Sequence, residues 1–276
     1  MKAYAKLNLY LNVNGRLPDG FHEITTVMQT VSLCDEVTVE KADGISVSIG
    51  APHIPCDERN TAFKAAREFF KACGIKDGAR ITIKKNIPDG AGMAGGSADA
   101  AATLIQLNNL YGSLLSKEEL LKAALSVGAD VPFCVTGGTA LCRGKGEIIT
   151  PIKAIPRCAF AIVKPLCSVG TPQAYAEYDR AGGDCPPPDA ILGAIKSGNA
   201  RALAAGMGNA LQKAASNLCP QIREETERLK AFGALGTQMT GSGSAVFGVF
   251  ENAGDAEKAA AELKRDDNVT FWALPV

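Results

Sequence analysis

The sequence has little that points to a metal or nucleic-acid function. Lysine plus arginine equals aspartate plus glutamate at 29 each, so the net charge is zero. The broad positive surface that nucleic acids and anionic membranes attract is therefore not expected. Only two histidines are present, and the nine cysteines include no C-x-x-C pair, which argues against zinc. We expect no nucleic-acid or membrane partner.

Long apolar segments are missing as well. No uninterrupted apolar run is long enough to cross a bilayer, and the N-terminus lacks the apolar block of a signal peptide. An odd number of scattered cysteines in a chain of 276 residues is typical of reduced thiols in a cytosolic protein. Because 46% of the residues are hydrophobic, a sizeable core is possible. We therefore expect a folded cytoplasmic protein.

Glycine is concentrated where a helix is predicted to begin. Residues 87–102 read IPDGAGMAGGSADAAA and lead into an alanine-rich helix expected over residues 96–111. Glycine lets backbone amides approach a ligand, and the first turn of a helix offers unpaired N–H groups. Together with the positive end of the helix dipole, these features favour a phosphate site. A tight strand-to-helix turn without a ligand is the alternative.

Residues 90–95 of this loop also match the pattern G-x-G-x-x-G of dinucleotide-binding folds. The preceding strand, ITIKKN at residues 81–86, is one-sided and carries two lysines, whereas the first Rossmann strand is buried on both faces. The Lys-Ser/Thr pair of a Walker A motif is absent. A nicotinamide-dependent oxidoreductase therefore stays only as an alternative.

The order of the predicted elements indicates an α+β fold, because strands and helices do not alternate strictly. Alternating residues predict a half-buried first strand over residues 3–13, with Lys6 and Asn8 on its polar face. Asn60 is expected to cap a helix over residues 62–73. The other predicted strands cover 24–33, 36–40, 45–49, 81–85, 138–143, 146–152, 159–164, 236–250 with an internal loop, and 269–274.

Four further places could carry chemistry. Lys6 lies either at a solvated strand edge or in a polar ligand cleft. Asp130 stands on a stiff turn before Pro132, where its carboxylate needs a cation or a donor, or else forms an ordinary Asx turn. His22 has no spacing that suggests a metal. The segment TGSGS at residues 240–244 is either a flexible hairpin or a loop that contacts phosphate.

Five segments, in this order, resemble the GHMP kinase superfamily, which is named for galactokinase and the homoserine, mevalonate and phosphomevalonate kinases. They are AKLNL at 5–9, LPDGFHEI at 17–24, PDGAGMAGGSADAA at 88–101, GADVPF at 128–133 and MTGSGSAVFG at 239–248. The first, second and fourth are most similar to the member that phosphorylates the C2 hydroxyl of a cytidine diphosphate-linked polyol in non-mevalonate isoprenoid biosynthesis. A homoserine- or mevalonate-type kinase is the alternative within the superfamily.

The resemblance implies a two-lobed α+β kinase. Residues 1–155 would form an N-terminal ATP-binding lobe like the second domain of ribosomal protein S5, and residues 156–276 a ferredoxin-like C-terminal lobe. ATP would be the phosphoryl donor, with Mg²⁺ beside it, and the partner would be a small molecule with a cytidine diphosphate group. The ATP phosphates would be held by Pro88, Asp89, Gly90, Ala91, Gly92, Met93, Ala94, Gly95, Gly96, Ser97 and Ala98. The metal ligands are not assigned.

The resemblance also implies roles for single residues. Lys6 and Asp130 would be the catalytic pair, with Asp130 accepting or orienting the hydroxyl proton and Lys6 stabilising the developing alkoxide. Phe21 and Tyr175 would stack on opposite faces of cytosine, and His22 would hydrogen-bond its polar edge.

Weaker assignments complete the site implied by the resemblance. Asn8 would lie near the polyol, and Thr171 and Gly243 are candidate contacts. The position of Phe21 is usually tyrosine in the family, so the ring is kept and the hydroxyl is lost. The family's Asn-Asp-Leu stretch reads NAL at residues 209–211, and we assign that region no role.

Overall fold

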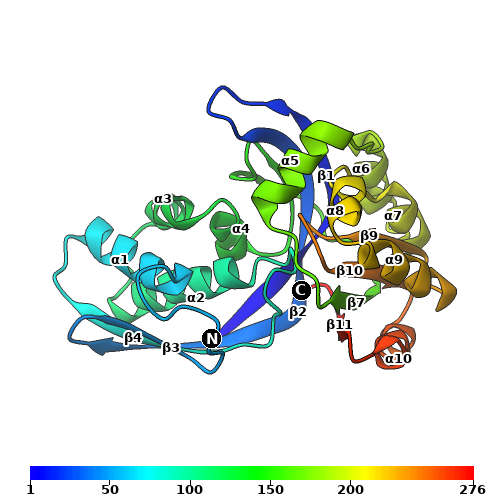
Figure 1. The fold of residues 1–276 in the computed structure, drawn as a ribbon. Helices are drawn as coiled ribbons and strands as arrows, with labels where there is room; N and C mark the ends of the chain where they lie inside the picture. Colours follow the sequence, from blue (N-terminus) through cyan, green and yellow to red (C-terminus); the bar gives the residue numbers. More distant parts are fainter. The chain divides into compact units, whose positions relative to one another are not determined.

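The computed structural model describes residues 1–276, which form two compact units. The first unit contains Met1–Ala5, Cys34–Ile87 and Ala94–Gly137, and the second contains Lys6–Leu33, Pro88–Met93 and Gly138–Val276. Strands β1 (Lys2–Arg16) and β2 (His22–Ala42) contribute residues to both units (Figure 1). The boundary predicted after residue 155, between an N-terminal and a C-terminal lobe, stays a prediction.

The first unit combines part of the seven-stranded sheet with four helices. Strand β4 (Gly78–Lys84) pairs antiparallel with the second half of β2 and parallel with β3 (Ile45–Ile49). The long helix α2 packs against the other three helices. The helices are α1 (Thr61–Cys73), α2 (Gly95–Leu110), α3 (Lys117–Val127) and α4 (Val131–Thr136).

In the second unit, β1 pairs parallel with β8 (Gly208–Asn209), and the first half of β2 pairs antiparallel with β5 (Thr139–Arg143), which in turn pairs with β6 (Ile148–Pro151). A separate sheet has the order β11-β7-β10-β9, with antiparallel neighbours throughout. Its strands are β7 (Ala159–Pro165), β9 (Gly236–Met239), β10 (Val246–Phe250) and β11 (Asn268–Ala273). The helices are α5 (Thr171–Ala181), α6 (Pro188–Ser197), α7 (Ala200–Gly206), α8 (Gln212–Leu218), α9 (Gln221–Ala231) and α10 (Ala253–Leu263).

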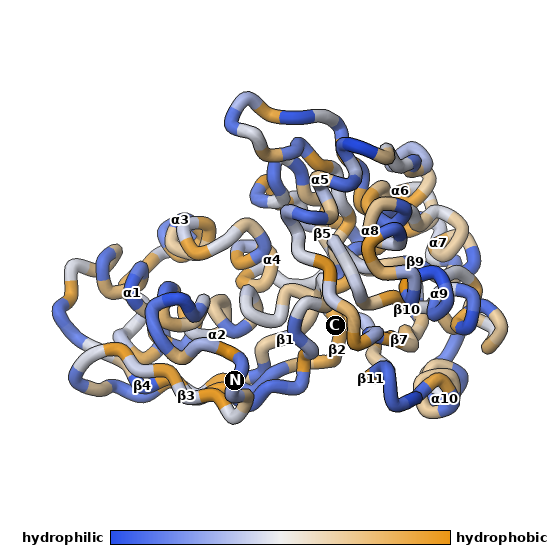
Figure 2. Tube along the Cα trace, in the orientation of Figure 1, coloured by the Kyte–Doolittle hydropathy of each residue, from blue (hydrophilic) through white to orange (hydrophobic).

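The four-stranded sheet has ferredoxin-like connectivity. Helices α9 and α10 both contact this sheet, and the chain runs from β7 through α9 to β9, β10, α10 and β11. The central strands β7 and β10 are entirely buried, and Phe160 and Phe247 meet edge-on in the core with ring centroids 5.7 Å apart. Figure 2 shows that the connection between α10 and β11 is hydrophilic. The predicted ferredoxin-like arrangement is therefore present.

Several expected elements differ from the observed ones. The strands predicted over 24–33 and 36–40 are one continuous strand, β2, because the buried carboxylate of Asp35 finds partners that let the strand continue through it. The short helices α4 and α8 were not predicted. The predicted cap of α1 is confirmed, since Asn60 Oδ1 accepts a hydrogen bond from the backbone N–H of Ala62 at 2.8 Å. None of the helices has both the length and the apolar composition of a membrane span.

Candidate functional site

The glycine loop at residues 88–93, in the second unit, lies against the loop at residues 240–245. The backbone N–H groups of Ser244 and Ala245 donate to the carbonyl oxygens of Gly90 and Ala91, both at 3.3 Å. Gly92 adopts φ 72°, and a Cβ there would stand 2.2 Å from the carbonyl oxygen of Thr240. Only glycine permits this approach. The segment at residues 240–244, predicted as either a hairpin or a phosphate-contacting loop, thus directly supports the glycine loop.

Lys6 is buried at the same place. Its ammonium donates to the carbonyl oxygen of Gly92 at 2.8 Å and hydrogen-bonds the side-chain oxygen of Asn8. A Cβ on Gly241 would lie 3.3 Å from this ammonium, so both glycine loops reach Lys6. The alternative of a solvated strand edge is wrong, because both faces of β1 are buried from residue 5 to residue 11. An ammonium has three N–H donors, so it can still bind a further acceptor.

Two polar residues that the sequence analysis missed hold this arrangement together. The Thr240 hydroxyl accepts from the backbone N–H of Asn8 at 3.0 Å and lies 3.3 Å from the carbonyl oxygen of Gly92. The side-chain amide of Asn209, in the stretch given no role, donates to the carbonyl oxygens of Met239 and Gly241 at 2.8 and 2.9 Å. These contacts join residues that are 30 or more positions apart in the sequence, so no local pattern signals them.

The first turn of α2, in the first unit, carries the rest of the predicted phosphate loop. Ala94 precedes the helix with a left-handed φ of 57°, and no side chain caps the helix there. Uncapped first-turn N–H groups and the helix dipole favour an anion. A Cβ on Gly95 would lie 3.3 Å from the Lys85 ammonium, and a Cβ on Gly96 would lie 3.1 Å from the Thr61 hydroxyl. These glycines keep the helix start closely packed.

A buried charge cluster lies beneath this helix start. The Lys85 ammonium donates to Asp35 at 2.5 Å and to Asp99 at 2.8 Å, and the other oxygen of Asp35 accepts from the backbone N–H groups of Asn86 and Ile87. Burial raises the pKa of Asp99 to about 7 against the opposing effect of Lys85, and the charge of Asp35 raises it further. Burial opposes the charge of Lys85, but the two carboxylates outweigh it and raise the lysine pKa.

This cluster was not foreseen, although its members are in the sequence. Of the two neighbouring lysines, Lys84 is exposed to solvent, whereas Lys85 is partly buried. The second oxygen of Asp99 is buried without a hydrogen-bond partner, which leaves acceptor capacity within the first two turns of α2.

Asp130 immediately precedes α4 in the first unit. It is half-buried, and its side chain makes no capping hydrogen bond with that helix, so the Asx-turn alternative finds no support. Pro132 lies in the first turn of the helix, where its fixed φ restricts the backbone that follows Asp130. Asp130 and Lys6 belong to different units, so their action as a pair stays a prediction.

The predicted base-binding residues lie in the second unit. The ring of His22 stacks on that of Tyr175 with centroids 4.7 Å apart and an interplanar angle of 21°. Its Nε2 lies 2.7 Å from Asp179. Phe21 is 61% exposed, and the Lys145 ammonium lies 4.1 Å from its ring centroid. His22 and Tyr175 are thus brought together, while Phe21 is exposed with the Lys145 ammonium over one face of its ring.

The two weaker contact candidates lie beside the 240–244 loop. The Thr171 hydroxyl, at the start of α5, shares a hydrogen bond of 2.9 Å with the Ser242 hydroxyl. Gly243 is buried with φ 90°, and a Cβ there would be 2.7 Å from the sulfur of Met239. The geometry gives Gly243 a packing role.

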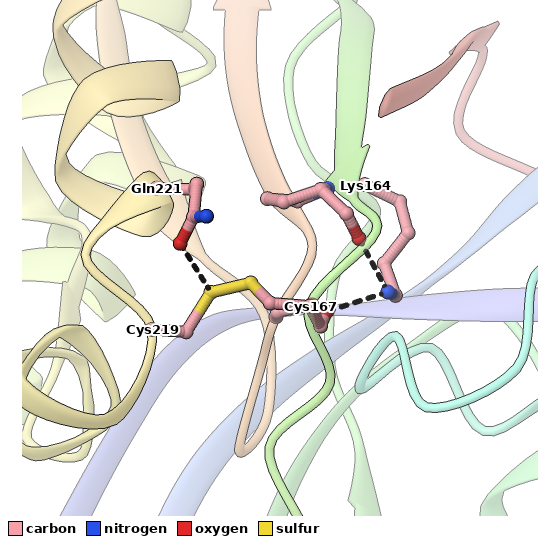
Figure 3. Close-up of a disulfide and its surroundings, with 6 residues drawn as sticks. Lys164, Cys167, Cys219 and Gln221 are labelled. Carbon is pink, nitrogen blue, oxygen red and sulfur yellow. Dashed lines mark hydrogen bonds between the residues drawn. A yellow bond between two sulfur atoms is a disulfide. The ribbon is translucent and has the colours of Figure 1, made fainter. Parts of the chain in front are cut away.

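Cys167 and Cys219 form a disulfide, so the expectation that all cysteines are reduced is wrong for this pair (Figure 3). The fold brings their Cα atoms to 6.3 Å although 52 residues separate them. The buried Lys164 donates to the carbonyl oxygens of Pro165 and Cys167, and burial lowers its pKa against the opposing charge of Asp89. The Ser244 hydroxyl donates to the same Cys167 oxygen at 2.6 Å, so this segment lies beside the loop at residues 240–245 that contacts the glycine loop.

Two glycine loops that meet at a buried lysine, in a chain with a ferredoxin-like sheet, define a class of small-molecule kinase. Comparison with known protein families agrees with this class. Residues 60–138 match the family model GHMP kinases N terminal domain, and residues 191–268 match the family model GHMP kinases C terminal. The chain belongs to the GHMP kinase family. The predicted α+β GHMP kinase fold is confirmed, and family membership excludes the nicotinamide-dependent alternative.

Within this family, the chain is similar to several kinases that share one name. The 4-diphosphocytidyl-2-C-methyl-D-erythritol kinase of Caldicellulosiruptor saccharolyticus is 46% identical over 267 residues, which cover 96% of this chain and 92% of that protein. The protein of the same name from Alkaliphilus metalliredigens is 40% identical over 266 residues, covering 95% and 91%. A crystal structure of 4-(cytidine 5'-diphospho)-2C-methyl-D-erythritol kinase matches with a TM-score of 0.84 and 35% identity, covering 100% of this chain and 98% of the other.

Proposed function

We propose that this chain transfers the γ-phosphoryl group of ATP to the C2 hydroxyl of 4-diphosphocytidyl-2-C-methyl-D-erythritol, a step in non-mevalonate isoprenoid precursor biosynthesis. The observation that carries the proposal is the Lys6 ammonium held 2.8 Å from the carbonyl oxygen of Gly92, inside a glycine loop. This contact fixes a cation beside a backbone cradle suited to phosphates. The near-full-length similarity to kinases of that name supplies the substrate.

The triphosphate would occupy the loop and helix start at residues 88–98. Three observations support this assignment: Gly90 and Gly92 adopt positive φ, the start of α2 has no side-chain cap, and a side chain at Gly92 would collide with the carbonyl oxygen of Thr240. Backbone N–H groups then meet the phosphate oxygens without an intervening side chain. A charged ligand at that helix start is also favoured by the dipole.

The transfer itself needs an oriented alcohol and stabilised charge more than covalent chemistry. In our proposal the C2 oxygen forms the new P–O bond, the bond between the γ-phosphorus and the ADP oxygen breaks, and Asp130 accepts or orients the hydroxyl proton. Lys6 stabilises the negative charge that develops on the C2 oxygen, since its position is fixed by Asn8 and Gly92. Both residues would act through placement.

Mg²⁺ would accompany ATP and neutralise charge on its phosphates. Mg²⁺ keeps several waters and binds through one or two protein groups plus phosphate oxygens. The structure contains no cluster of three or more His, Cys, Asp or Glu side chains suited to a metal, which fits a cation carried mainly by the nucleotide. Ser97, in the first turn of α2, is the protein group that we propose for it.

The cytidine diphosphate group would bind at the start of β2 and at α5. Phe21 and Tyr175 supply aromatic faces for the base, and His22 supplies a hydrogen bond to its edge. Asn8 hydrogen-bonds both Lys6 and Thr26, so its part in binding the polyol would be mainly to position Lys6. Thr171 remains a candidate contact. Cytoplasmic location and the absence of nucleic-acid and membrane partners also stay predictions.

An acceptor panel tests this function. Purified chain with ATP and Mg²⁺ should release ADP with the cytidylyl substrate and not with homoserine or mevalonate, and the product should carry one new phosphate on C2 by ³¹P NMR. The Asp130→Asn variant is the matched negative control. Turnover of homoserine or mevalonate at a higher kcat/KM would instead support the other GHMP kinase alternatives.

A further inference from the structure

Helix α5 presents an aromatic ring and a carboxylate to one histidine. Tyr175 and Asp179 are four residues apart on the helix and therefore lie on the same face. His22, at the start of β2, stacks on the Tyr175 ring, and its Nε2 lies 2.7 Å from Asp179 Oδ1. Tyr178 meets the same imidazole edge-on at 6.4 Å. The plane of the ring and one of its nitrogens are therefore both fixed.

We propose that Asp179 is a positioning residue that holds His22 as the Nε2–H tautomer, so that Nδ1 accepts a hydrogen bond from the exocyclic amine of cytosine. The inference rests on the proposed function, because it concerns the same base. It adds a residue that determines which base is accepted.

The tautomer follows from the chemistry of the contact. An ionised carboxylate only accepts hydrogen bonds, so an imidazole nitrogen 2.7 Å away must carry the proton. In the neutral ring the other nitrogen is then a bare acceptor. Arg16 lies 4.0 Å from the second oxygen of Asp179. The His22 side chain is 9% exposed and that of Asp179 39%, so the contact orients a covered ring from a partly solvated helix face.

The consequence is selectivity between pyrimidines. Cytosine presents an amine donor at position 4, whereas uracil presents a carbonyl acceptor at the same place. A bare Nδ1 is complementary to the amine and opposes the carbonyl oxygen. If the proton moved to Nδ1, the preference would weaken or reverse. The hydrogen bond from the neutral His22 ring to the partly solvated Asp179 carboxylate should add little stability, so the main effect of Asp179 should be on selectivity.

The tautomer can be measured without any activity. The chain has only two histidines, and His53→Gln leaves His22 as the sole imidazole. Long-range ¹H–¹⁵N spectra of this variant should show a protonated Nε2 and an unprotonated Nδ1, and addition of CDP should shift the Nδ1 signal more than UDP. Adding Asp179→Ala should give a mixture of tautomers. Asp179→Glu should restore the original pattern.

Kinetics supply the second readout. Asp179→Ala should lower the ratio of kcat/KM for the cytidylyl substrate over its uridylyl analogue by about tenfold or more, with kcat for the cytidylyl substrate little changed. Glu177→Gln on the same helix, where Glu177 bonds Arg180 and Asn217, is the matched control and should keep the ratio.

Two outcomes overturn the inference: a protonated Nδ1 in the Asp179-containing protein, or an unchanged base ratio once Asp179→Ala has mixed the tautomers. Failure of the proposed function looks different. In that case the protein would not phosphorylate the cytidylyl substrate at all, while the tautomer and its response to CDP would still decide the role of Asp179.

Discussion

The ammonium of Lys6 is held from two sides, by the side-chain oxygen of Asn8 and by the backbone oxygen of Gly92. A buried lysine on a strand usually needs a charged partner, because burying an uncompensated charge is costly. Here the ammonium meets neutral oxygens beside the glycine loop that we propose for the phosphates. Its position therefore suits a cation that completes its environment when an anionic ligand binds.

Substitutions at the proposed catalytic pair should affect turnover. Lys6→Met and Asp130→Asn should each lower kcat by about 100-fold or more, because charge stabilisation and proton handling in the transition state are each worth that much. If the two residues act as a unit, the double variant should be about as slow as the slower single variant. Steady-state ADP release measures all three variants, with Lys2→Met on the same strand as the control. A double variant whose loss of kcat equals the product of the two single losses would contradict paired action.

Substitutions at the base-binding rings should act on binding. Phe21→Ala or Tyr175→Ala should raise KM for the cytidylyl substrate about tenfold, because stacking on a base contributes ~1–3 kcal/mol. The value of kcat should change little. Phe232→Ala, which removes another exposed ring, is the control in the same initial-rate assay. An unaltered KM in both ring variants would remove the stacking assignment.

At the scale of elements, β4 and α2 are tied together by charge. Lys85 follows β4, Asp99 lies in α2, and Asp35 lies in the middle of β2, so three elements meet at one ammonium. A carboxylate buried with a lysine and a second carboxylate is a strongly coupled arrangement. It stiffens the helix start on which the phosphate assignment rests.

Sequence analysis could predict elements whose signals are local. The cap at Asn60 and the helix after the glycine loop follow from neighbouring residues, and both are confirmed. The ferredoxin-like order of strands and helices, which the resemblance to the GHMP kinases implied, is confirmed as well. The continuity of β2 through Asp35 could not be predicted, since its partner Lys85 lies 50 residues away. For the same reason the alternating pattern of β1 wrongly favoured solvation of Lys6.

The Asp99 cluster predicts a pH dependence of stability. Because its folded pKa of about 7 is above the usual aspartate value of 3.8, the folded chain binds this proton more tightly than the unfolded chain. Between about pH 4 and pH 7 the free energy of unfolding should therefore fall as pH rises, and the contribution should level off above pH 7.

Urea denaturation at several pH values measures this slope. Asp99→Asn should flatten it, whereas the exposed Asp43→Asn of the same unit should not. Lys85 remains charged throughout this window, because its pKa is raised above 10.5. An identical slope in the wild-type protein and Asp99→Asn would mean that the buried carboxyl group does not titrate in this range.

On the scale of the whole molecule, each compact unit is assembled from segments that are not contiguous in sequence. Strands β1 and β2 and the glycine loop all contribute residues to both units, so no single position in the sequence divides the two compact units. The predicted boundary after residue 155 stays a prediction. The motifs identified the family because they are short continuous segments that occur in the family's order along the chain. Supporting contacts such as those of Asn209 and Asp179 depend on folding alone.

The disulfide gives a test on the intact chain. Closing a loop of 52 residues should contribute about 2–4 kcal/mol to the free energy of unfolding. Reduction should therefore lower the denaturation midpoint of the wild-type protein and leave Cys219→Ser unchanged. Thiol titration of the denatured, unreduced chain should find seven free cysteines and nine after reduction. Nine thiols before reduction would show that the bond is not formed.

The most direct test of the central claim is a crystal structure with a non-hydrolysable ATP analogue and the cytidylyl substrate. The account predicts that the triphosphate lies along residues 88–98, and that Lys6 Nζ and an Asp130 oxygen are both within hydrogen-bonding distance of the C2 hydroxyl. A triphosphate bound elsewhere, or a C2 hydroxyl remote from both side chains, would contradict it.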